Sequence, residues 1–478
     1  MKAFIATVLI FTLIALLTSP TAWSAELTLD NCIELALKNR ASIIAALGAE
    51  KIASSNKRAA LGAFMPRIGA DYSYAKSKDT HIKFEQDVAP LLGIDSILVE
   101  SYMPDSTGLN PDTTPPVWAV FSRPIYGQST IHEFESPDQD RSSKNLSFSA
   151  RMSIFEPANW FNYAAARADH ARARLDVLAS EQDLIYSVKV AYFAYLASVE
   201  NISVQEEAVR RAEEQLKLIE SRYELGSASL SEVLKQKVQH GNDRLGLLRA
   251  RNAVTNSRAV LAYTIGVDPR QDHEFSPSYE SREYRGTLED AIDFGLAYQP
   301  GLLSAGKSVD AARHSVRAAK SAYLPTLSGW ASYSFTDGTR GDTVTFDQSS
   351  RSRTIGFSVS YNIFDGFFRE SRVTQAKVAY NNGMARLADM RNEVVSYIKT
   401  GYHDVEQIKE QKSVADENVM AANEDLKITQ EKYRLGAATI LDLLDAQVSL
   451  KTAQVSLIQA DFDLNLAIAR LENAMGKM

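Results

Sequence analysis

Four segments of the chain alternate apolar and polar residues with a period of two. They are expected at about residues 67–76, 145–155, 327–336 and 354–364. In the first, Ile68, Ala70 and Tyr72 alternate with glycine, acidic or hydroxyl residues. Strands of this length with one apolar and one polar face are typical of outer-membrane β-proteins, in which the apolar face meets lipid. The alternative is a soluble antiparallel sheet that buries one face.

Four strands are too few to close a barrel. An open sheet edge in lipid leaves backbone groups without hydrogen bonds, at a cost of several kcal/mol each. If these strands span a membrane, several chains must therefore share one barrel.

Between the strand pairs the apolar pattern becomes helical. It predicts long helical hairpins over residues 160–265 and 367–475, with first arms running from about Trp160 to Tyr223 and from Phe367 to Tyr433. At ~1.5 Å per residue these arms are roughly 100 Å long. Helices of this length are typical of coiled coils rather than of globular domains.

The last helix carries two apolar stripes, each with a seven-residue repeat. One stripe is Leu443, Leu450, Leu457, Leu464 and Leu471, and the other is Leu441, Val448, Val455, Phe462 and Ala469. The stripes lie on roughly opposite sides of the helix, so it is expected to pack against a neighbour on each side. Successive helices packed in this way form a wall, and a closed wall is a tube. A polar strip that includes Asp442 and Asp445 runs between the stripes and would face either the lumen or the outer solvent.

The chain is an internal duplication. "LTLDNCIELAL" from Leu27 matches "GTLEDAIDFGL" from Gly286, and "YELGSASLSEVL" from Tyr223 matches "YRLGAATILDLL" from Tyr433. The first repeat is expected over residues 25–265 and the second over 287–478, joined by a linker or equatorial segment at 266–286. The first repeat also carries a proline-rich insertion, predicted to be a long loop over residues 77–144, with or without local structure of its own.

The N-terminus predicts export from the cytoplasm. Residues 1–24 have the charged, apolar and small-residue regions of a secretory signal peptide. Cys32 is the only cysteine. It excludes an intramolecular disulfide and is expected to be a small buried helical residue rather than a lipidated one. The formal net charge of −7 argues against a nucleic-acid partner.

The sequence offers no reactive constellation. "GLLSAGKS", from Gly301 to Ser308, satisfies the phosphate-binding loop pattern, but it follows a helical segment instead of a strand, and its counterpart in the first repeat lacks the motif. We therefore expect no catalytic residues, no cofactor and no metal site, and the protein is not expected to be an enzyme.

Signal peptide, duplication, strand pairs, long helices and the two turn motifs together resemble the TolC family of outer-membrane efflux proteins, the outer-membrane factors. The resemblance implies a mixed α and β membrane protein of the Gram-negative outer membrane. It implies a homotrimer that shares a twelve-stranded β-barrel in outer-membrane lipid, four strands per chain, continued by an α-helical barrel in the periplasm.

The function implied by the resemblance is that of a passive exit duct in a tripartite efflux or type I secretion system. Its partners would be a periplasmic membrane-fusion adaptor and an inner-membrane pump of the RND, ABC or MFS type. The alternative is a soluble periplasmic coiled-coil adaptor or scaffold. Such a protein would have one helical hairpin flanked by soluble β-domains, instead of two copies with amphipathic strands.

The resemblance also assigns roles to residues at the two turns. Asp442 and Asp445 would form a carboxylate ring at the periplasmic gate, which attracts cations and whose crowded carboxylates should have raised pKa values; the alternative is a solvated helix face. Tyr433 and Glu232 would lock the gate, with packing as the alternative role for Tyr433. The hairpin tips that would contact the adaptor are Leu225, Gly226, Ser227, Leu435, Gly436 and Ala437.

One position departs from the family pattern at this lock. Ala438 stands where some members carry an arginine. The closed state is therefore expected to rest on fewer links, or on Arg434.

Overall fold

The computed structural model describes residues 27–79, 83–101, 117–128, 130–135, 139–276, 279, 284–340 and 350–477. The predicted signal peptide lies outside the described residues. The chain divides into a helical unit, formed by residues up to 64, 156–325 and those from 361 onward, and a sheet unit, formed by residues 65–155 and 326–360.

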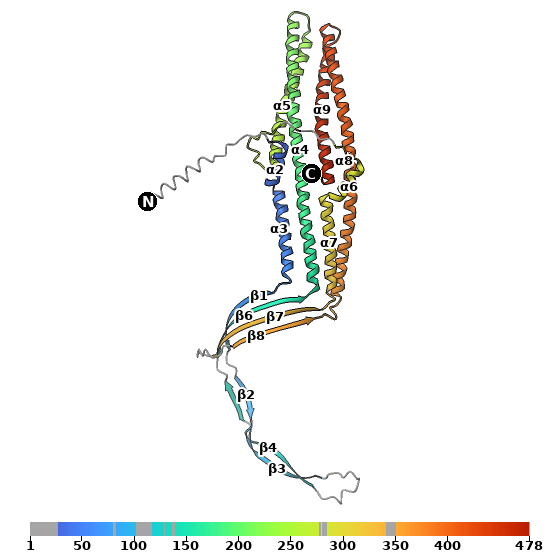
Figure 1. Cartoon of the computed structure of the whole chain (residues 1–478). Coiled ribbons are helices and arrows are strands. Elements are labelled where there is room, and N and C mark those ends of the chain that lie inside the picture. The colour runs from blue at the N-terminus through green and yellow to red at the C-terminus, as the bar shows by residue number, and fades with distance from the viewer. Residues whose placement is uncertain are drawn as a thin grey trace, which may run out of the picture. The chain divides into compact units, whose positions relative to one another are not determined.

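The helical unit repeats one order of elements twice. The first copy supplies α2 (Leu29–Asn39), α3 (Ala41–Gly62), α4 (Pro157–Glu224) and α5 (Leu230–Ile265). The second copy supplies α6 (Leu288–Tyr298), α7 (Pro300–Ser321), α8 (Phe368–Arg434) and α9 (Ile440–Met475). In each copy a short helix is followed directly by a second helix, and a long helix then forms a hairpin with the last helix of the copy (Figure 1).

Local signals explain where these helices begin. Thr28 and Thr287 occupy the same position in the two copies, and each caps its helix by accepting a hydrogen bond from a backbone N–H of the first turn. Pro157 opens α4 at a position where the missing N–H costs nothing. The 68 residues of α4 and the 67 of α8 agree with the long arms predicted from the sequence.

Each copy has its own hydrophobic core. In the first, α2 buries Cys32 against α4 and α5, next to Tyr192 and Leu261. In the second, α6 packs on α8 and α9 around Ile398 and Leu471. Cys32 is the buried helical residue that the sequence predicted, and burial raises the pKa of its thiol to about 12.

Polar contacts join the two copies where α4 runs beside α9. Lys189 on α4 forms an ion pair with Glu472 on α9 at 2.8 Å. Gln182 donates a hydrogen bond to the carbonyl oxygen of Gly476 at 2.7 Å. These bonds satisfy half-buried groups and fix how the two halves of the helical unit pack.

No helix within the described residues has an apolar stretch long enough to cross a membrane.

The sheet unit contains the four strands that the alternation predicted. They are β1 (Arg67–Asp79), β6 (Gln139–Phe155), β7 (Thr326–Arg340) and β8 (Ser350–Ser360), all antiparallel and in the order β1-β6-β7-β8. Strands from both copies therefore form one sheet, and β1 and β8 are its edges.

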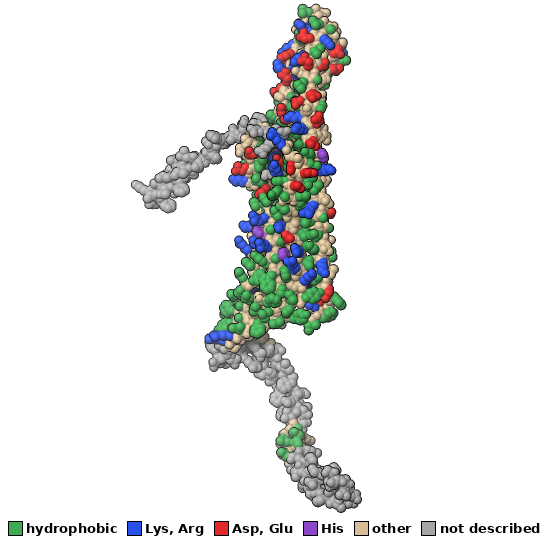
Figure 2. Space-filling view, turned by 45° about the vertical axis from the view of Figure 1, so that its right-hand side comes forward, with side chains coloured by type: hydrophobic (Ala, Val, Ile, Leu, Met, Phe, Trp, Pro, Cys, Tyr) green, Lys and Arg blue, Asp and Glu red, His purple; other side chains and the backbone are tan. Residues whose placement is uncertain are grey.

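One face of this sheet is apolar from edge to edge. The strand register places Ile68, Ala150, Ala331 and Ile355 in one row across it. Large side chains on this face remain exposed within the single chain: Ile355 is 87 % exposed and Phe357 is 77 % exposed. Figure 2 shows hydrophobic side chains gathered over this part of the molecule. A sheet with such a face requires an apolar environment to cover it.

The segment predicted as a long loop contains local structure, which the sequence left open. Within residues 77–144, β2 (Lys83–Val88) pairs with β5 (Thr130–Glu135), and β3 (Leu91–Ser101) pairs with β4 (Val117–Tyr126). β1 and β6 also extend into this segment, through a polar stretch whose pairing leaves no alternating apolar signal. The remaining residues of the predicted loop lie outside the described ranges.

The fourth strand also ends earlier than the alternation suggests. Ser360 pairs with Thr326, the first residue of β7 after Pro325, so residues beyond Ser360 have no partner strand. Gly366 and Phe367 then adopt left-handed backbone conformations before α8 begins.

Candidate functional site: the two hairpin tips

The two long hairpins turn through the same backbone geometry. The first tip is Leu225 to Ser229, between α4 and α5, and the second is Leu435 to Thr439, between α8 and α9. They lie at the same end of the helical unit (Figure 1). Gly226 has φ +75° and Gly436 has φ +76°, a left-handed conformation in which a side chain would be strained.

Backbone hydrogen bonds close both turns in the same way. The N–H of Ser227 donates to the carbonyl of Arg222 at 2.8 Å, and the N–H of Ala437 donates to that of Lys432 at 2.7 Å. These bonds, six residues to one, are those of a Schellman motif that ends a helix at a glycine. The repeated tyrosine-and-glycine sequence is therefore a helix-stop signal present in both copies.

Each tip then starts its second helix with a side-chain cap. Thr439 and Asp442 form a capping box at the start of α9: the hydroxyl of Thr439 accepts from the N–H of Asp442, and the carboxylate of Asp442 accepts from the N–H of Thr439 at 2.7 Å. The backbone and side-chain hydrogen bonds from Thr439 lower the pKa of Asp442. Sequence reasoning assigned Asp442 to the gate and missed this structural role.

The predicted lock residues lie in contact. Tyr433, at the end of α8, donates a hydrogen bond from its hydroxyl to Oε2 of Glu232, at the start of α5, at 3.1 Å. Tyr433 is only 8 % exposed. Burial, followed by the charge of Glu232, raises the pKa of this tyrosine, so it remains a donor. The bond joins the two hairpins across their tips.

The cation beside this pair is Arg222 rather than Arg434. The guanidinium of Arg222, on α4, lies 5.6 Å from the centre of the Tyr433 ring. Arg434 instead forms an ion pair with Glu431 on its own helix at 2.9 Å. Ala438 packs against the apolar cluster beneath the tips. Position 222 carried no signal of this contact in the sequence, because the partner lies on the other repeat.

An apolar cluster supports the lock. It is built from Ile219, Leu426, Tyr433, Ile440, Leu443, Ala446 and Leu450. Ile219 is the member from the first copy, and it inserts among residues of α8 and α9. The two tips are therefore held by packing as well as by the tyrosine hydrogen bond.

A second polar bridge between the hairpins was missed from the sequence. Asp243 on α5 accepts from Lys451 on α9 at 2.7 Å, and its other oxygen accepts from Gln239 at 3.0 Å. The side chain of Asp243 is only 5 % exposed. The signal was available: Gln236, Asp243 and Ala250 are spaced by seven residues and are all buried, so an acid on that stripe needed a partner.

The two stripes of α9 have different surroundings within one chain. Leu443, Leu450 and Leu471 are buried, as expected for a seam. Leu441 and Val448, on the other stripe, are exposed near the tip. Asp442 and Asp445 are exposed as well. The chain by itself therefore leaves one seam of α9 without a partner near the tip.

The turn residues themselves are open to solvent. Leu225 and Leu435 project from the two tips as exposed leucines. Gly226 and Gly436 have no atom within 4 Å of the place where a Cβ would lie. Figure 2 shows that charged side chains of both signs cover this end of the helical unit.

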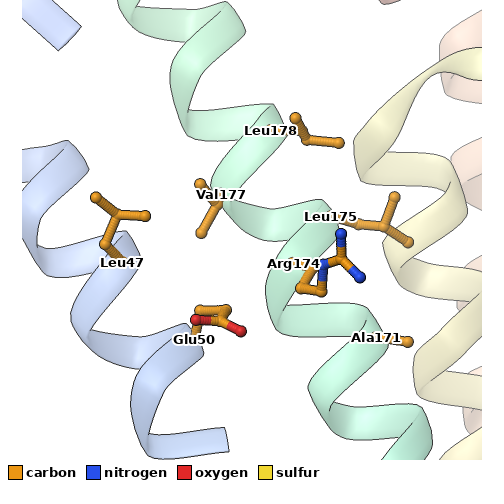
Figure 3. A pocket seen from close by; sticks show the side chains of 7 residues that line it. All are labelled: Leu47, Glu50, Ala171, Arg174, Leu175, Val177 and Leu178. Carbon is orange, nitrogen blue, oxygen red and sulfur yellow. The ribbon is translucent and has the colours of Figure 1, made fainter. Parts of the chain in front are cut away.

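A hollow of about 430 Å³ lies elsewhere, beside α3 and α4. Figure 3 shows Leu47 and Glu50 on α3 and five lining residues on α4. Glu50 accepts from Nε2 of His170 at 2.7 Å, and Nδ1 of His170 lies 3.3 Å from Nζ of Lys57. The acid and the imidazole satisfy each other, so the hollow has the features of helix packing and not of a reactive centre.

The described residues also account for the sequence motifs that suggested other chemistry. Gly301 to Ser308 lies inside the continuous helix α7, so it forms no phosphate-binding loop. Within the described part of the chain, no group of three or more His, Cys, Asp or Glu side chains could hold a metal ion.

Comparison with known proteins gives consistent matches. The family model described as outer membrane efflux protein matches residues 126–267 and 292–477, one segment in each repeat. The chain is 24 % identical to the outer membrane efflux protein BepC of Brucella suis, over 74 % of this chain and 77 % of that protein. It is 25 % identical to the outer membrane protein TolC of Escherichia coli, over 70 % and 69 % of the two chains.

Solved structures share the fold. The outer membrane protein VceC of Vibrio cholerae superposes with a TM-score of 0.71 at 20 % identity, over 94 % of this chain and 96 % of that one. The CmeC outer membrane channel of Campylobacter jejuni superposes with a TM-score of 0.72 at 16 % identity, over 94 % and 85 %. The fold is therefore TolC-like, and the two matched segments correspond to the internal duplication. Because the family model covers most of both repeats, the chain belongs to the outer membrane efflux protein family, whose members are outer-membrane channels and not enzymes.

Proposed function

We propose that three copies of this chain form the exit duct of a tripartite efflux or type I secretion system. The duct receives substrates from a periplasmic adaptor and an inner-membrane pump, and it conducts them passively to the cell exterior. Family membership supports the trimeric channel and the tripartite setting. The names of relatives include alkaline protease secretion and pyoverdine export, so the proposal concerns the duct and not one cargo.

The exposed apolar face of the four-stranded sheet is the observation that carries this proposal. In water, side chains such as Ile355 and Phe357 would have no cover. In lipid they would be favourable, but the edges β1 and β8 would lack hydrogen-bond partners. Pairing β8 of one copy with β1 of the next satisfies both requirements, and three copies give a closed barrel of twelve strands.

The chain connections suggest the orientation. α3, α4, α7 and α8 join the sheet at the strand ends near Arg67, Phe155, Thr326 and Ser360. β2 to β5 continue from the opposite ends of β1 and β6. We place the helical unit in the periplasm, so that β2 to β5 lie on the extracellular side.

The contacts at the tips suggest how the duct is closed. The hydrogen bond from Tyr433 to Glu232 and the buried pair of Asp243 and Lys451 each join the first hairpin to the second. Opening the periplasmic end requires the hairpins to separate, so both bonds oppose opening. Asp445 and Asp442 lie at the same end and would give the narrow entrance a preference for cations.

The exposed turn residues would meet the adaptor. Leu225 and Leu435 present apolar side chains at the ends of two long hairpins, next to the left-handed glycine of each tip. Apolar side chains on a charged surface are typical anchors for a protein partner.

The experiment is single-channel conductance of the detergent-purified protein in a planar bilayer. Wild type should give small openings that prefer cations. The double variant Asp442→Ala, Asp445→Ala should lose much of that preference. The matched control Asp416→Ala, Glu417→Ala removes two exposed acids from the middle of α8 and should keep it.

The outcomes separate the channel from its gate. Unchanged selectivity in the tip variant would remove the aspartates from the constriction and leave the channel intact. Protein that stays soluble without detergent and never inserts would instead support the soluble adaptor or scaffold.

A further inference from the structure

Three polar positions of the lock are repeated in both copies with the same spacing. Tyr223 corresponds to Tyr433, and Glu232 corresponds to Asp442. Arg222 corresponds to Lys432, so the cation is also repeated. Each copy therefore carries one tyrosine donor, one carboxylate acceptor and one cation at its tip.

Within a single chain, only half of these groups take part in a contact between the two hairpins. The lock takes its tyrosine from the second tip and its acid and cation from the first, namely Glu232 and Arg222. The complementary set is Tyr223, Asp442 and Lys432. Tyr223 is 45 % exposed, and its side chain makes no hydrogen bond or ring contact with any other described residue.

The carboxylate of Asp442, in the complementary set, has one oxygen that can accept a further hydrogen bond. Glu232 accepts from the hydroxyl of Ser229 through Oε1 and from Tyr433 through Oε2. Asp442 accepts both of its bonds from Thr439 through Oδ2. Its Oδ1 therefore corresponds to Oε2 of Glu232 but accepts no hydrogen bond from the described residues.

The helix faces next to the tips also differ between the copies, since a face that packs within the chain in one copy is exposed in the other. Within the chain, Ile458 of α9 is buried and Val455 is half-buried. Their counterparts on α5, Leu245 and Leu248, are exposed. Because the two copies fold alike, the uncovered face of α5 has the shape of a surface that packs on a second hairpin of the other type.

We propose that Tyr223 of one copy donates a hydrogen bond to Asp442 of the neighbouring copy, with Lys432 of that copy beside the tyrosine ring. The partner is thus a second copy of this chain, bound through the contact that already joins its own two halves. The inference rests on the proposed trimer and goes beyond it by naming the residues of the seam. Three locks within chains and three between chains would then alternate around the entrance.

This arrangement changes the roles of the two aspartates. Asp442 would be held at the seam by Thr439 and by Tyr223 of the next copy. Asp445 corresponds to Lys235 in the first repeat, so it has no acidic counterpart and no place in the repeated lock. Asp445 would therefore be the main charge of the constriction.

Cysteine cross-linking of the full-length protein in its membrane tests the contact. Cys32 is the only native cysteine and is fully buried, so the background is low. Tyr223→Cys with Asp442→Cys, treated with a short thiol cross-linker, should give denaturation-resistant dimers and trimers. The matched pair Glu232→Cys with Tyr433→Cys should cross-link within one chain and keep monomer mobility.

The outcomes are distinguishable. Cross-linking in the matched pair but none between Tyr223→Cys and Asp442→Cys, in protein that is still trimeric by native mass, would overturn the seam contact and leave the proposed duct standing. Protein that is not trimeric would overturn both.

A substitution that removes only the hydroxyl tests the hydrogen bond itself. Tyr223→Phe should raise the closed-state conductance several-fold, and adding Asp442→Asn should raise it little further, because both changes remove one bond. Adding Glu232→Gln instead should multiply the effect, because that acid belongs to the other lock. Multiplicative effects in both pairs would contradict the proposal.

Discussion

The two hairpin tips have the same backbone and different surroundings. Both end a long helix at a left-handed glycine, and both start the next helix with a hydroxyl cap. Yet Tyr433 is almost fully buried against the other hairpin, and Tyr223 is half exposed. The turn follows from local chemistry, which the duplication copied. The burial of a side chain depends on which hairpin lies beside it, and a single chain supplies that neighbour to only one tip.

Breaking an ion pair that has no counterpart in the other copy should cause the largest loss of stability. Asp243 and Lys451 have no ionic counterparts, since Ala453 and Gly241 occupy the equivalent positions. Lys451→Met should destabilise the protein by about 3–5 kcal/mol, because it leaves a buried carboxylate unpaired. The midpoint of denaturant unfolding of the detergent-purified protein measures this loss.

Restoring neutrality is the control for this prediction. Asp243→Asn combined with Lys451→Met should recover most of the loss, since no buried charge remains unpaired. A double variant as unstable as Lys451→Met alone would mean that packing, and not the unpaired charge, accounts for the effect.

The next effect should come from the lock within the chain. Tyr433→Phe removes one hydrogen bond to a carboxylate, worth about 1.5–3 kcal/mol. The ring and its contact with Arg222 remain, so packing is kept. Unfolding of the purified protein should show the loss, together with larger closed-state conductance. If Glu232→Gln and Tyr433→Phe proved strictly additive, the two groups would not be acting through one bond.

A backbone substitution should affect the two tips equally. Gly226→Ala and Gly436→Ala each force a side chain into the left-handed region, at about 1–2 kcal/mol. Neither Cβ would meet another atom, so the cost is conformational and local. Thermal unfolding of the two variants should agree closely. A much larger effect at Gly436 would show that the second turn carries strain from its neighbour.

The sequence predicted most of the fold because the fold follows periodic patterns. The period of two located four strands, and the seven-residue stripes located the helices and a buried seam through Leu443 and Leu450. The pattern did not reveal β2 to β5, because these strands lie within the proline-rich insertion and lack a regular alternation of apolar and polar residues; β3, for example, begins Leu91-Leu92-Gly93-Ile94. It also placed the fourth strand too far along, because pairing ends at Pro325 on the partner strand and not where the alternation ends.

The candidate site was less predictable, because its contacts join residues far apart in the sequence. Tyr433 and Glu232 came from family resemblance, and their bond within one chain is a property of the three-dimensional structure. Arg222 was missed since an arginine near a turn is common and carries no sign of its partner on the other repeat. The capping role of Asp442 was readable, because threonine followed three residues later by an acid is a helix-start signal. Asp243 was readable too, as an acid on a buried stripe.

The smallest effect concerns the pH dependence of the second tip. Hydrogen bonds from Thr439 lower the pKa of Asp442 in the folded protein. Their contribution to stability is therefore fully present above the ordinary aspartate pKa, and it is lost as pH falls through the lowered folded value. Thr439→Ala removes the hydroxyl cap at about 1 kcal/mol. The backbone N–H of residue 439 still donates to the carboxylate, so the pKa of Asp442 should rise only part of the way toward its ordinary value. The free energy of unfolding of the variant, measured against pH, should begin to fall at a higher pH than that of wild type.

Ser229→Ala is the control, because it removes a similar cap at the equivalent position of the first tip without touching Asp442. The pH at which stability is lost should therefore stay as in wild type. An equal shift in both variants would trace the pH dependence to the helices in general and not to this carboxylate.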